Sequence, residues 1–431
     1  MPTIANTELN FEREPLSHPF GFKGGALTEL WQVVAELKGE SGKRGLGLGV
    51  QSVLWSDAAL FTERAEAAGN CLMFLMTEYA LREAGGRKFD SPPELLHELF
   101  PRVLDFGKQL TGRRDLRPTF ALNALVAVDL AAWSLIARER GAGRFDDLLP
   151  PSCAAALRGR QEKLARIPLI TYGTSQKEIQ RLVEEGCFLL KVKIGADPDG
   201  DGDRRKMLDW DRERLSSLHE QLKEWKCPFT ENGRIAFYLD ANGRYDSKER
   251  LLALVDHADR IGVLDRIQLL EEPFPEEFAE DVSDVPLRIV ADESAHTTED
   301  AVRRIELGYG AIALKPIAKT LSMSLEVAAA AHERGVPCFC ADLTVNPLMV
   351  EWNRNVAARL DPLPGLRVGV LETNGEQNYR NWEKMLSYHP RGDESWVWGE
   401  SGFFPLNDDY YRTGGGIFDS APHYESLVGR V

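Results

Sequence analysis

The stretch LLKVKIG (Leu189–Gly195) decides the fold, because it predicts an apolar strand that carries two lysines and because similar segments follow it along the chain. Side chains alternate along a strand, so Lys191 and Lys193 share one face and the apolar residues share the other. Like charges and burial both lower lysine pKa values, which is one way to obtain a neutral amine that accepts a proton. An exposed edge strand protected by its lysines is the alternative interpretation.

Apolar segments of this kind recur along the chain, with helical patterns between them. The eight predicted strands are Ile167–Tyr172, Phe188–Ile194, Ile235–Asp240, Ile267–Glu271, Leu287–Asp292, Ala311–Lys315, Pro337–Ala341 and Leu366–Leu371. The run Ser175–Glu178 is a capping box that predicts the start of the first intervening helix. Eight short apolar strands alternating with helices predict an α/β fold, a (β/α)8 barrel of the TIM type.

The sequence on either side of the barrel lacks this rhythm. We expect residues 1–165 to form a separate N-terminal α+β domain, residues 166–390 to form the barrel, and residues 391–431 to form a tail that packs back on the first domain. The glycine run Gly45–Gly49 lacks the lysine of a phosphate-binding loop, so it predicts a turn or hairpin. The long segment 196–231 opens with acidic residues, but Leu208 stands where a calcium loop needs a glutamate, so a charged surface excursion is expected.

Composition limits the classes of function. Asp and Glu total 67 against 52 Lys and Arg, and the resulting charge of −15 disfavours nucleic-acid binding. Six cysteines without a Cys-x-x-Cys pair indicate reduced thiols in a cytoplasmic protein, and residues 1–10 have no signal-peptide pattern. Ala121–Ala137 is interrupted by Asn123 and Asp129, so a buried helix is expected there and not a membrane span.

Three consecutive predicted strands end in a carboxylate, namely Asp240, Glu271 and Asp292. Catalytic residues of such barrels lie at the C-terminal ends of the strands. Each acid alone could cap a helix, but three converging carboxylates repel one another unless a hard cation neutralises them, and oxygen ligands suit Mg²⁺. Lys193 and Lys315 flank this group and could act on opposite faces of a substrate carbon α to a carboxylate, with Lys191 nearest that carboxylate.

At this point the chain resembles the enolase superfamily, and within it the muconate-lactonizing enzyme and dipeptide epimerase subgroup of the mandelate racemase/muconate lactonizing enzyme family. The matching stretches are KVKIG (Lys191–Gly195), LDAN (Leu239–Asn242), LEEP (Leu270–Pro273), ADES (Ala291–Ser294), ALKP (Ala313–Pro316) and the helix Ala121–Gly141. The resemblance implies a barrel with an N-terminal capping domain that the C-terminal tail completes.

The resemblance also implies roles for single residues. Asp240, Glu271 and Asp292 become the Mg²⁺ ligands, Lys193 and Lys315 the acid/base pair, and Lys191 the lysine beside the substrate carboxylate. Glu272 points away from this group by alternation. No histidine ends the seventh strand, which favours two-lysine chemistry over a lysine/histidine pair.

Substrate choice is implied to depend on two capping-domain loops, Pro15–Gly25 and Gly47–Val53, and on the last strands. The expected substrate contacts are Asn242, Glu372, Asp342, Phe20 and Phe22. Dipeptide epimerases have Asp-x-Asp at the end of the eighth strand, whereas this chain has Glu372-Thr373-Asn374, which leaves the dipeptide assignment open. Glu372 and Asp342 could also be loop caps.

The expected function is Mg²⁺-dependent abstraction of the proton α to a carboxylate, through an enediolate, by a racemase or epimerase of a carboxylic acid or amino-acid derivative. A cycloisomerase, or a dehydratase or lyase similar to o-succinylbenzoate synthase, would use the same half-reaction, and a catalytically silent barrel is a remoter alternative. No dinucleotide fingerprint supports a dehydrogenase. The expected partner is a small carboxylate, without nucleic acid or membrane, and the protein is expected to be a homo-oligomer.

Overall fold

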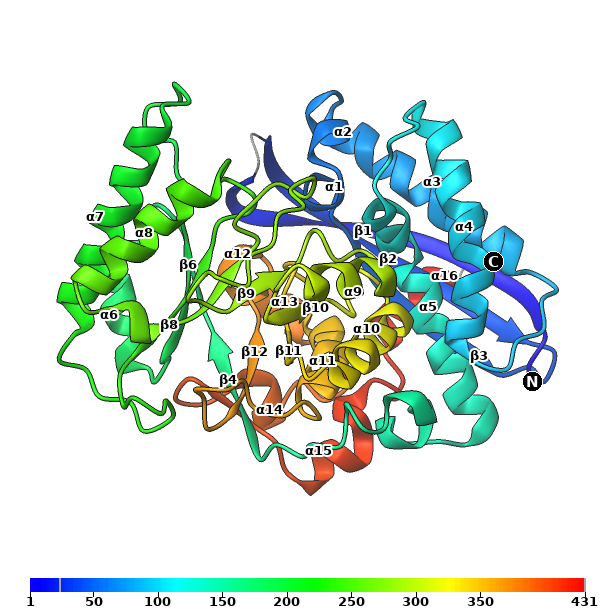
Figure 1. Cartoon of the computed structure of the whole chain (residues 1–431). Helices are drawn as coiled ribbons and strands as arrows, with labels where there is room; N and C mark the ends of the chain where they lie inside the picture. Colours follow the sequence, from blue (N-terminus) through cyan, green and yellow to red (C-terminus); the bar gives the residue numbers. More distant parts are fainter. Residues whose placement is uncertain (23–24, 430–431) are drawn as a thin grey trace.

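The computed structural model describes residues 1–22 and 25–429, and the side chain of Phe22 lies outside this description. The described residues form two sheets, a ten-stranded one that makes the barrel and a three-stranded antiparallel one in the N-terminal part (Figure 1). The predicted fold class, a barrel of the TIM type with an N-terminal α+β part, is therefore confirmed.

The barrel is closed through a divided first strand. Its strands are β4 (Lys163–Ile167), β5 (Leu169–Ile170), β6 (Leu189–Lys193), β7 (Ala236–Asp240), β8 (Ile267–Glu271), β9 (Ile289–Ala291), β10 (Ala311–Leu314), β11 (Cys338–Cys340) and β12 (Gly369–Glu372). Only Pro168, which has no N–H to donate, separates β4 from β5. Because β4 pairs with β12 and β5 pairs with β6, the two halves join the ends of the sheet into a ring.

Helices cover the outside of the ring. They are α6 (Gln176–Glu184), α7 (Arg204–Leu222), α8 (Lys248–Arg260), α9 (Thr298–Glu306), α10 (Leu321–Glu333) and α11 (Pro347–Ala357). Two short helices, α12 (Gly375–Asn378) and α13 (Trp382–Leu386), follow the last strand, and α12 contacts β1. Single 3-10 turns lie at Phe145–Leu148, Pro151–Cys153, Leu264–Arg266 and Gly414–Gly416. Ser175 and Glu178 form the predicted capping box of α6. The alternation is interrupted once, because no helix separates β8 from β9 in the described chain.

The prediction of a charged surface excursion at 196–231 is wrong for most of its length, because this segment contains the long helix α7. Asp203 caps this helix by accepting hydrogen bonds from the backbone N–H groups of Arg205 and Lys206. Lys206 Nζ lies 2.7 Å from Asp199 and 2.6 Å from Asp201, so the acidic run before the helix is balanced by a lysine of its own segment.

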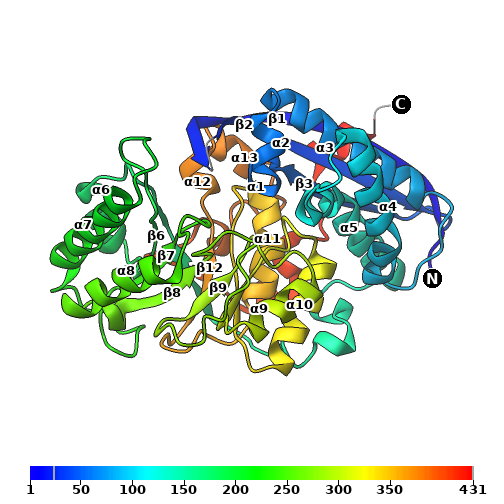
Figure 2. The same cartoon turned by 45° about the horizontal axis from the view of Figure 1, so that its top comes forward.

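The N-terminal part is a long hairpin with helices on one side. Its elements are β1 (Ile4–Phe22), β2 (Gly25–Gly39), β3 (Arg44–Gln51), α1 (Val53–Ser56), α2 (Ala58–Thr62), α3 (Glu66–Ala84), α4 (Pro92–Thr111) and α5 (Pro118–Arg140). The loop predicted at Pro15–Gly25 is wrong, since β1 continues through Phe22 with one register shift between Pro15 and Phe20. The loop predicted at Gly47–Val53 is likewise mostly strand β3. Strand β1 lies beside α12, and Leu16 of β1 pairs with Tyr379 directly after that helix (Figure 2).

The glycine run in β3 allows helix α5 to contact the strand directly. A Cβ atom at Gly45 would lie 2.2 Å from the carbonyl oxygen of Ala131, and one at Gly47 would lie 2.0 Å from that of Ala127. No side chain fits at either position, so these glycines allow close packing. They lie in the second strand of the antiparallel β2–β3 pair, which agrees with the predicted hairpin and not with the turn. Helix α5 is long and apolar enough to cross a membrane, but that apolar window is entirely buried in the protein.

The C-terminal tail touches both sheets. It contains α14 (Ser395–Trp398), β13 (Phe403–Pro405), α15 (Asp408–Thr413) and α16 (Pro422–Val428). Strand β13 pairs antiparallel with β4 of the barrel. In α16, His423 Nε2 lies 2.9 Å from Glu12 of β1, and the carbonyl of Leu427 accepts a hydrogen bond from Asn10. The boundaries at 165 and 390 stay predictions.

Candidate active site

The C-terminal ends of the barrel strands face the N-terminal hairpin across a cavity of about 600 Å³, part of it open to solvent. Its polar wall contains Lys191, Lys193, Asp240, Asn242, Glu271, Asp292, Lys315, Asp342, Thr344, Glu372 and Asn374, and its apolar wall contains Leu16, Phe20, Leu27, Leu30, Leu54, Trp55, Leu169 and Leu343. The structure therefore brings together every site residue expected from the sequence except Phe22, whose side chain lies outside the described part.

Lys191 lies at the centre of the polar wall. Its Nζ is 3.1 Å from Asp240 Oδ2, 3.0 Å from Glu271 Oε2 and 3.1 Å from Glu372 Oε2. Burial favours the neutral amine, but the three facing carboxylates raise the pKa of Lys191 well above its ordinary value. The lowered pKa expected for this lysine is therefore wrong, because the attraction of the carboxylates exceeds the effects of burial and like charge.

Lys193 lies on the same face of β6, one pleat nearer the strand end, and is more accessible than Lys191. Its Nζ is 2.7 Å from Asp240 Oδ2 and donates a hydrogen bond of 2.5 Å to Asn242 Oδ1. Burial alone would raise the pKa of Asp240, but the two lysines of β6 outweigh it and lower that pKa to about 2. Asp240 is thus a fully ionised partner of both lysines.

Lys315 follows β10 on the opposite side of the site. Its Nζ lies 2.5 Å from Asp292 Oδ2 and 4.5 Å from the centre of the Trp55 ring. Burial would lower the pKa of Lys315, but Asp292 raises it. Lys319 lies four residues further on, in the turn before α10, and donates hydrogen bonds to the backbone carbonyls of Asp292 and, at 2.9 Å, Ala295. Sequence reasoning missed Lys319 and Trp55.

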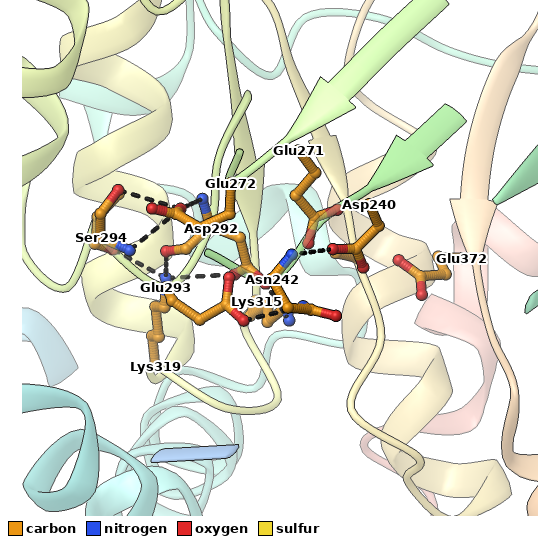
Figure 3. Close-up of polar contacts among 12 residues, drawn as sticks. Asp240, Asn242, Glu271, Glu272, Asp292, Glu293, Ser294, Lys315, Lys319 and Glu372 are labelled. Carbon is orange, nitrogen blue, oxygen red and sulfur yellow. Dashed lines mark hydrogen bonds and ion pairs between the residues drawn. The ribbon is translucent and has the colours of Figure 1, made fainter. Parts of the chain in front are cut away.

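The carboxylates converge next to these lysines (Figure 3). One oxygen from each of Glu271, Asp292 and Glu293 lies within 4.8 Å of the others, and all three side chains are buried. Burial and the charge of Asp292 raise the pKa of Glu271 to about 8. Burial opposes ionisation of Asp292 as well, but Lys315 and Lys319 hold its pKa below the ordinary value.

Glu293 is a member of this cluster that the sequence interpretation did not select. Strand alternation would place it on the face opposite Asp292, but β9 ends at Ala291, so alternation no longer applies to either residue. Glu293 Oε1 accepts a hydrogen bond of 3.0 Å from Asn242 Nδ2. Asn242, with φ +45°, thus lies between Lys193 and Glu293.

Glu272 turns away from the cavity, as alternation predicted. Its φ of +36° marks a sharp bend directly after β8. Its Oε2 accepts hydrogen bonds from the backbone N–H of Asp292 at 2.8 Å and from the backbone and hydroxyl of Ser294 (Figure 3). Glu272 therefore fixes the turn that carries Asp292. Burial, together with the charge of Glu293, raises the pKa of Glu272 to about 8.

The ends of β11 and β12 form the remaining polar wall. Glu372, the last residue of β12, faces Lys191. Asp342 follows β11, and its Oδ2 accepts a hydrogen bond of 2.6 Å from the backbone N–H of Asn374. Burial, together with the charge of Glu372, raises the pKa of Asp342 to about 7.

The barrel is closed, and its strand ends carry lysines on both sides of buried carboxylates. An N-terminal sheet covers this site. These features define the class of capped barrel enzymes that the sequence motifs indicated. Residues 174–364 match the family described as enolase C-terminal domain-like. This match covers most of the barrel and identifies that part of the chain as an enolase C-terminal domain-like domain.

Individual relatives agree with this assignment. The L-Lys-D/L-Arg epimerase of Methylococcus capsulatus is 26% identical over 308 residues, which cover 69% of this chain and 70% of that protein. A mandelate racemase/muconate lactonizing protein from Herpetosiphon aurantiacus has a TM-score of 0.63 at 17% identity, covering 95% and 97% of the two chains. A dipeptide epimerase from Enterococcus faecalis, complexed with Mg and L-Leu-L-Tyr, has a TM-score of 0.60 at 17% identity, covering 88% and 92%. The two structures show the shared fold.

Proposed function

We propose that the protein is an isomerase, a Mg²⁺-dependent racemase or epimerase that removes and returns the proton α to a substrate carboxylate. The observation that carries this proposal is the position of the two candidate bases. Three strands, β7 to β9, separate β6 from β10 in one direction around the ring, and β11, β12 and the divided strand β4/β5 separate them in the other. Lys193 and Lys315 therefore approach the cavity from opposite sides, as a two-base reaction requires.

The residues present fit a divalent cation. The buried oxygens of Glu271, Asp292 and Glu293 are hard donors within 4.8 Å of one another, and Asp240 lies next to them on β7. We assign Asp240, Glu271 and Asp292 as ligands, with Glu293 as a further carboxylate beside them. When bound, Mg²⁺ supplies positive charge that stabilises the extra negative charge on a substrate carboxylate whose α-proton has been removed.

The side chains of the chain perform the proton transfer. One of Lys193 and Lys315 accepts the α-proton and the other returns a proton to the opposite face, while Lys191 holds the substrate carboxylate. A lysine must be neutral to act as a base, and the carboxylates that raise the pKa of Lys315 include Asp292 and Glu271, which we assign to the metal. Leu16 and Phe20 of the hairpin cover this region and limit access of water.

The test is exchange of the α-proton in D₂O with Mg²⁺, over pooled amino acids, dipeptides, sugar acids and aromatic acids. We expect deuterium to enter one class of acid with inversion of configuration. Exchange or product formation without inversion would identify the cycloisomerase or lyase alternative. Absence of exchange from every acid, with Mg²⁺ bound, would contradict the proposal and favour a silent barrel.

Metal binding has its own readout. Asp240→Asn should weaken Mg²⁺ binding in calorimetry and reduce exchange to the same extent, whereas Asp199→Asn, in the exposed loop before α7, should change neither. Unchanged Mg²⁺ affinity in Asp240→Asn would remove Asp240 from the ligand set and leave Glu293 as the third carboxylate.

Three expectations from the sequence stay predictions. They are a small carboxylate as the partner, with neither nucleic acid nor membrane, assembly into a homo-oligomer, and a cytoplasmic location.

A further inference from the structure

We infer, on the basis of the proposed function, that Asp342 is a specificity-determining residue that binds a cationic group of the substrate. The matching substrate is a carboxylic acid that carries an ammonium group beside an apolar chain. The inference starts from the charge partners of the carboxylates in the cavity.

Asp342 differs from every other carboxylate of the cavity wall. Lys191 lies within 3.1 Å of Asp240, Glu271 and Glu372, and Lys315 lies 2.5 Å from Asp292. No Lys, Arg or His nitrogen of residues 1–22 and 25–429 lies within 4.0 Å of the Asp342 carboxylate. Asp342 is only 5% exposed, so water supplies little of the missing stabilisation.

A carboxylate is a costly choice at this position if its role is to cap the loop. The hydrogen bond from the backbone N–H of Asn374 needs only a neutral acceptor, which an Asn or Ser side chain also provides. Burying an unpaired charge is unfavourable unless a partner of opposite charge joins it. Since Asp342 lines the cavity, that partner can be a group of the bound substrate.

The loop that carries Asp342 is held in one conformation. Thr344, two residues later, has φ +60°, an unfavourable value for a β-branched residue. Its carbonyl accepts a hydrogen bond of 2.7 Å from Tyr379 Oη, and Tyr379 Oη in turn accepts one of 2.9 Å from the buried side chain of Gln32 in β2. Asn346 donates to the other end of the Gln32 amide at 3.0 Å. The Asp342 loop is thereby bonded to both the hairpin and the barrel, which limits movement of the carboxylate away from the cavity.

The charges and the shape of the cavity define the ligand. Three lysines and five carboxylates line it, so the wall carries two negative charges once a bound cation and substrate keep all five carboxylates ionised. A bound Mg²⁺ would neutralise these two negative charges. A substrate carboxylate then adds one negative charge to the cavity, and an ammonium group of the same substrate would neutralise it. Leu343, next to Asp342, and the hairpin residues Leu16, Phe20 and Leu27 provide the apolar surface for the rest of the substrate.

The experiment compares two probes that differ in one charge, L-Leu-L-Leu and its N-acetyl derivative, by calorimetry with the Mg²⁺-loaded full chain. The wild type should bind the free dipeptide about tenfold or more tightly than the acetylated one. Asp342→Asn, which retains an acceptor for Asn374, should lose about tenfold or more affinity for the free dipeptide and change by less than about threefold toward the acetylated one. The matched control is Asp129→Asn, because Asp129 is also buried and accepts a hydrogen bond from a backbone N–H, that of Ser322, outside the cavity. This control should retain the wild-type preference.

Several outcomes would overturn the inference. These are equal binding of the two probes by the wild type, binding of neither, or equal loss of both in Asp342→Asn with unchanged Mg²⁺ affinity, which would make Asp342 a loop cap only. The pooled exchange assay separates this failure from failure of the proposed function. Exchange confined to acids without an ammonium group would retain the isomerase and reject the role of Asp342, whereas absence of all exchange would reject the isomerase.

Discussion

Single residues in this site act mainly through the charges that they face. The β6 lysines keep Asp240 ionised, and the carboxylates keep Lys191 and Lys315 protonated, so each group sets the protonation state of its neighbour. Such an arrangement keeps Lys315 in its charged form until a cation and a substrate rearrange these contacts. Lys193 and Lys315 are then distinguished by their positions on opposite sides of the ring.

Replacing Lys193 or Lys315 should slow α-proton exchange of one substrate enantiomer much more than that of the other. In Lys193→Ala, exchange of one substrate enantiomer should fall about 10²-fold or more, with much less effect on the other, because general-base catalysis contributes about 10²–10⁴-fold. Lys315→Ala should show the opposite preference. Deuterium incorporation into each enantiomer, followed by NMR, measures this.

Lys206→Ala is the control, because this exposed lysine pairs with Asp199 and Asp201 away from the cavity. Equal loss with both enantiomers in Lys193→Ala would indicate a single base.

Strand alternation predicted which residues of the strands face the cavity, and the structure places Lys191, Lys193 and Asp240 there. It also selected Asp292 and Lys315, each one residue beyond its strand, but it could not find Glu293 or Lys319, whose positions depend on the turns that follow. Trp55 belongs to the N-terminal part, far from Lys315 in sequence, and no local pattern links them. Sequence reasoning is thus reliable for side chains on regular backbone and weak for those placed by turns or by tertiary contacts.

At the scale of elements, the hairpin β1–β2 and the loops after β11 and β12 form one hydrogen-bonded unit. Gln32 connects them, with its amide between Tyr379 Oη and Asn346. The adjacent backbone reinforces the contact, since Arg380 N–H donates a hydrogen bond of 3.1 Å to the carbonyl of Pro15. The apolar wall and the substrate-side polar wall of the cavity are therefore positioned together.

Breaking this connection should impair substrate binding more than catalysis. Gln32→Leu leaves buried polar partners unpaired, and we expect the free energy of unfolding to fall by about 1–3 kcal/mol. For the acid identified by exchange, KM should rise about tenfold while kcat stays within about threefold, since a loss of uniform binding affects KM alone. Urea unfolding and steady-state kinetics measure the two effects.

Gln161→Leu is the matched control. This glutamine also bonds at both ends, to the carbonyl of Leu360 and to the N–H of Gly369, but at the start of β12, the end of the barrel away from the cavity. It should lower stability without changing KM. A fall in kcat with unchanged KM in Gln32→Leu would contradict a positioning role.

The hairpin also shows why element boundaries were harder to predict than element types. Pro15 and the glycines at 21, 24 and 25 read locally as a loop, yet pairing of β1 with β2 continues past the bulge at Pro15. In β3 the glycines indicated a turn or hairpin, and they form the second strand of the β2–β3 hairpin in close contact with α5. In both places long-range pairing outweighed local propensity.

At the scale of the whole molecule, helix α5 joins the N-terminal part to the barrel. Asp129 of α5 accepts hydrogen bonds from the backbone N–H and the hydroxyl of Ser322, at 3.1 Å and 2.5 Å, at the start of α10. Trp133, one turn later, donates to the same hydroxyl at 3.0 Å. Burial raises the pKa of Asp129 to about 6, so the charge of this contact changes within an accessible pH range.

This raised pKa predicts how stability depends on pH. In the folded chain Asp129 retains its proton up to about pH 6, whereas the unfolded chain loses it near pH 3.8. The contribution of the neutral acid is therefore fully present below pH 3.8 and is lost as pH rises through 6. Relative to Asp129→Asn, the wild type should lose about 3 kcal/mol of unfolding free energy across this window. Urea unfolding of both proteins from pH 4 to 7.5 measures the difference, and a constant difference would contradict the raised pKa.

The overall architecture was the most predictable level, because eight apolar strands alternating with helices admit few arrangements. The missing helix between β8 and β9 and the pairing of β13 with β4 were not predicted. Neither feature leaves a periodic pattern in the sequence. A strand of three residues such as β13 can be recognised only by its pairing with another strand.

The divided first strand has a consequence for the order of folding. Leu164 of β4 pairs with Gly369 of β12, so the ring cannot close until almost the whole chain has been synthesised. Until then β4 presents unpaired backbone groups, a template for association with other chains. Contacts between residues so distant in sequence form slowly, because the entropy of closing the loop must be lost before the pairing stabilises it. Closure at β4 and β12 is therefore the step at which we expect folding to be slowest and the nascent protein most prone to aggregation.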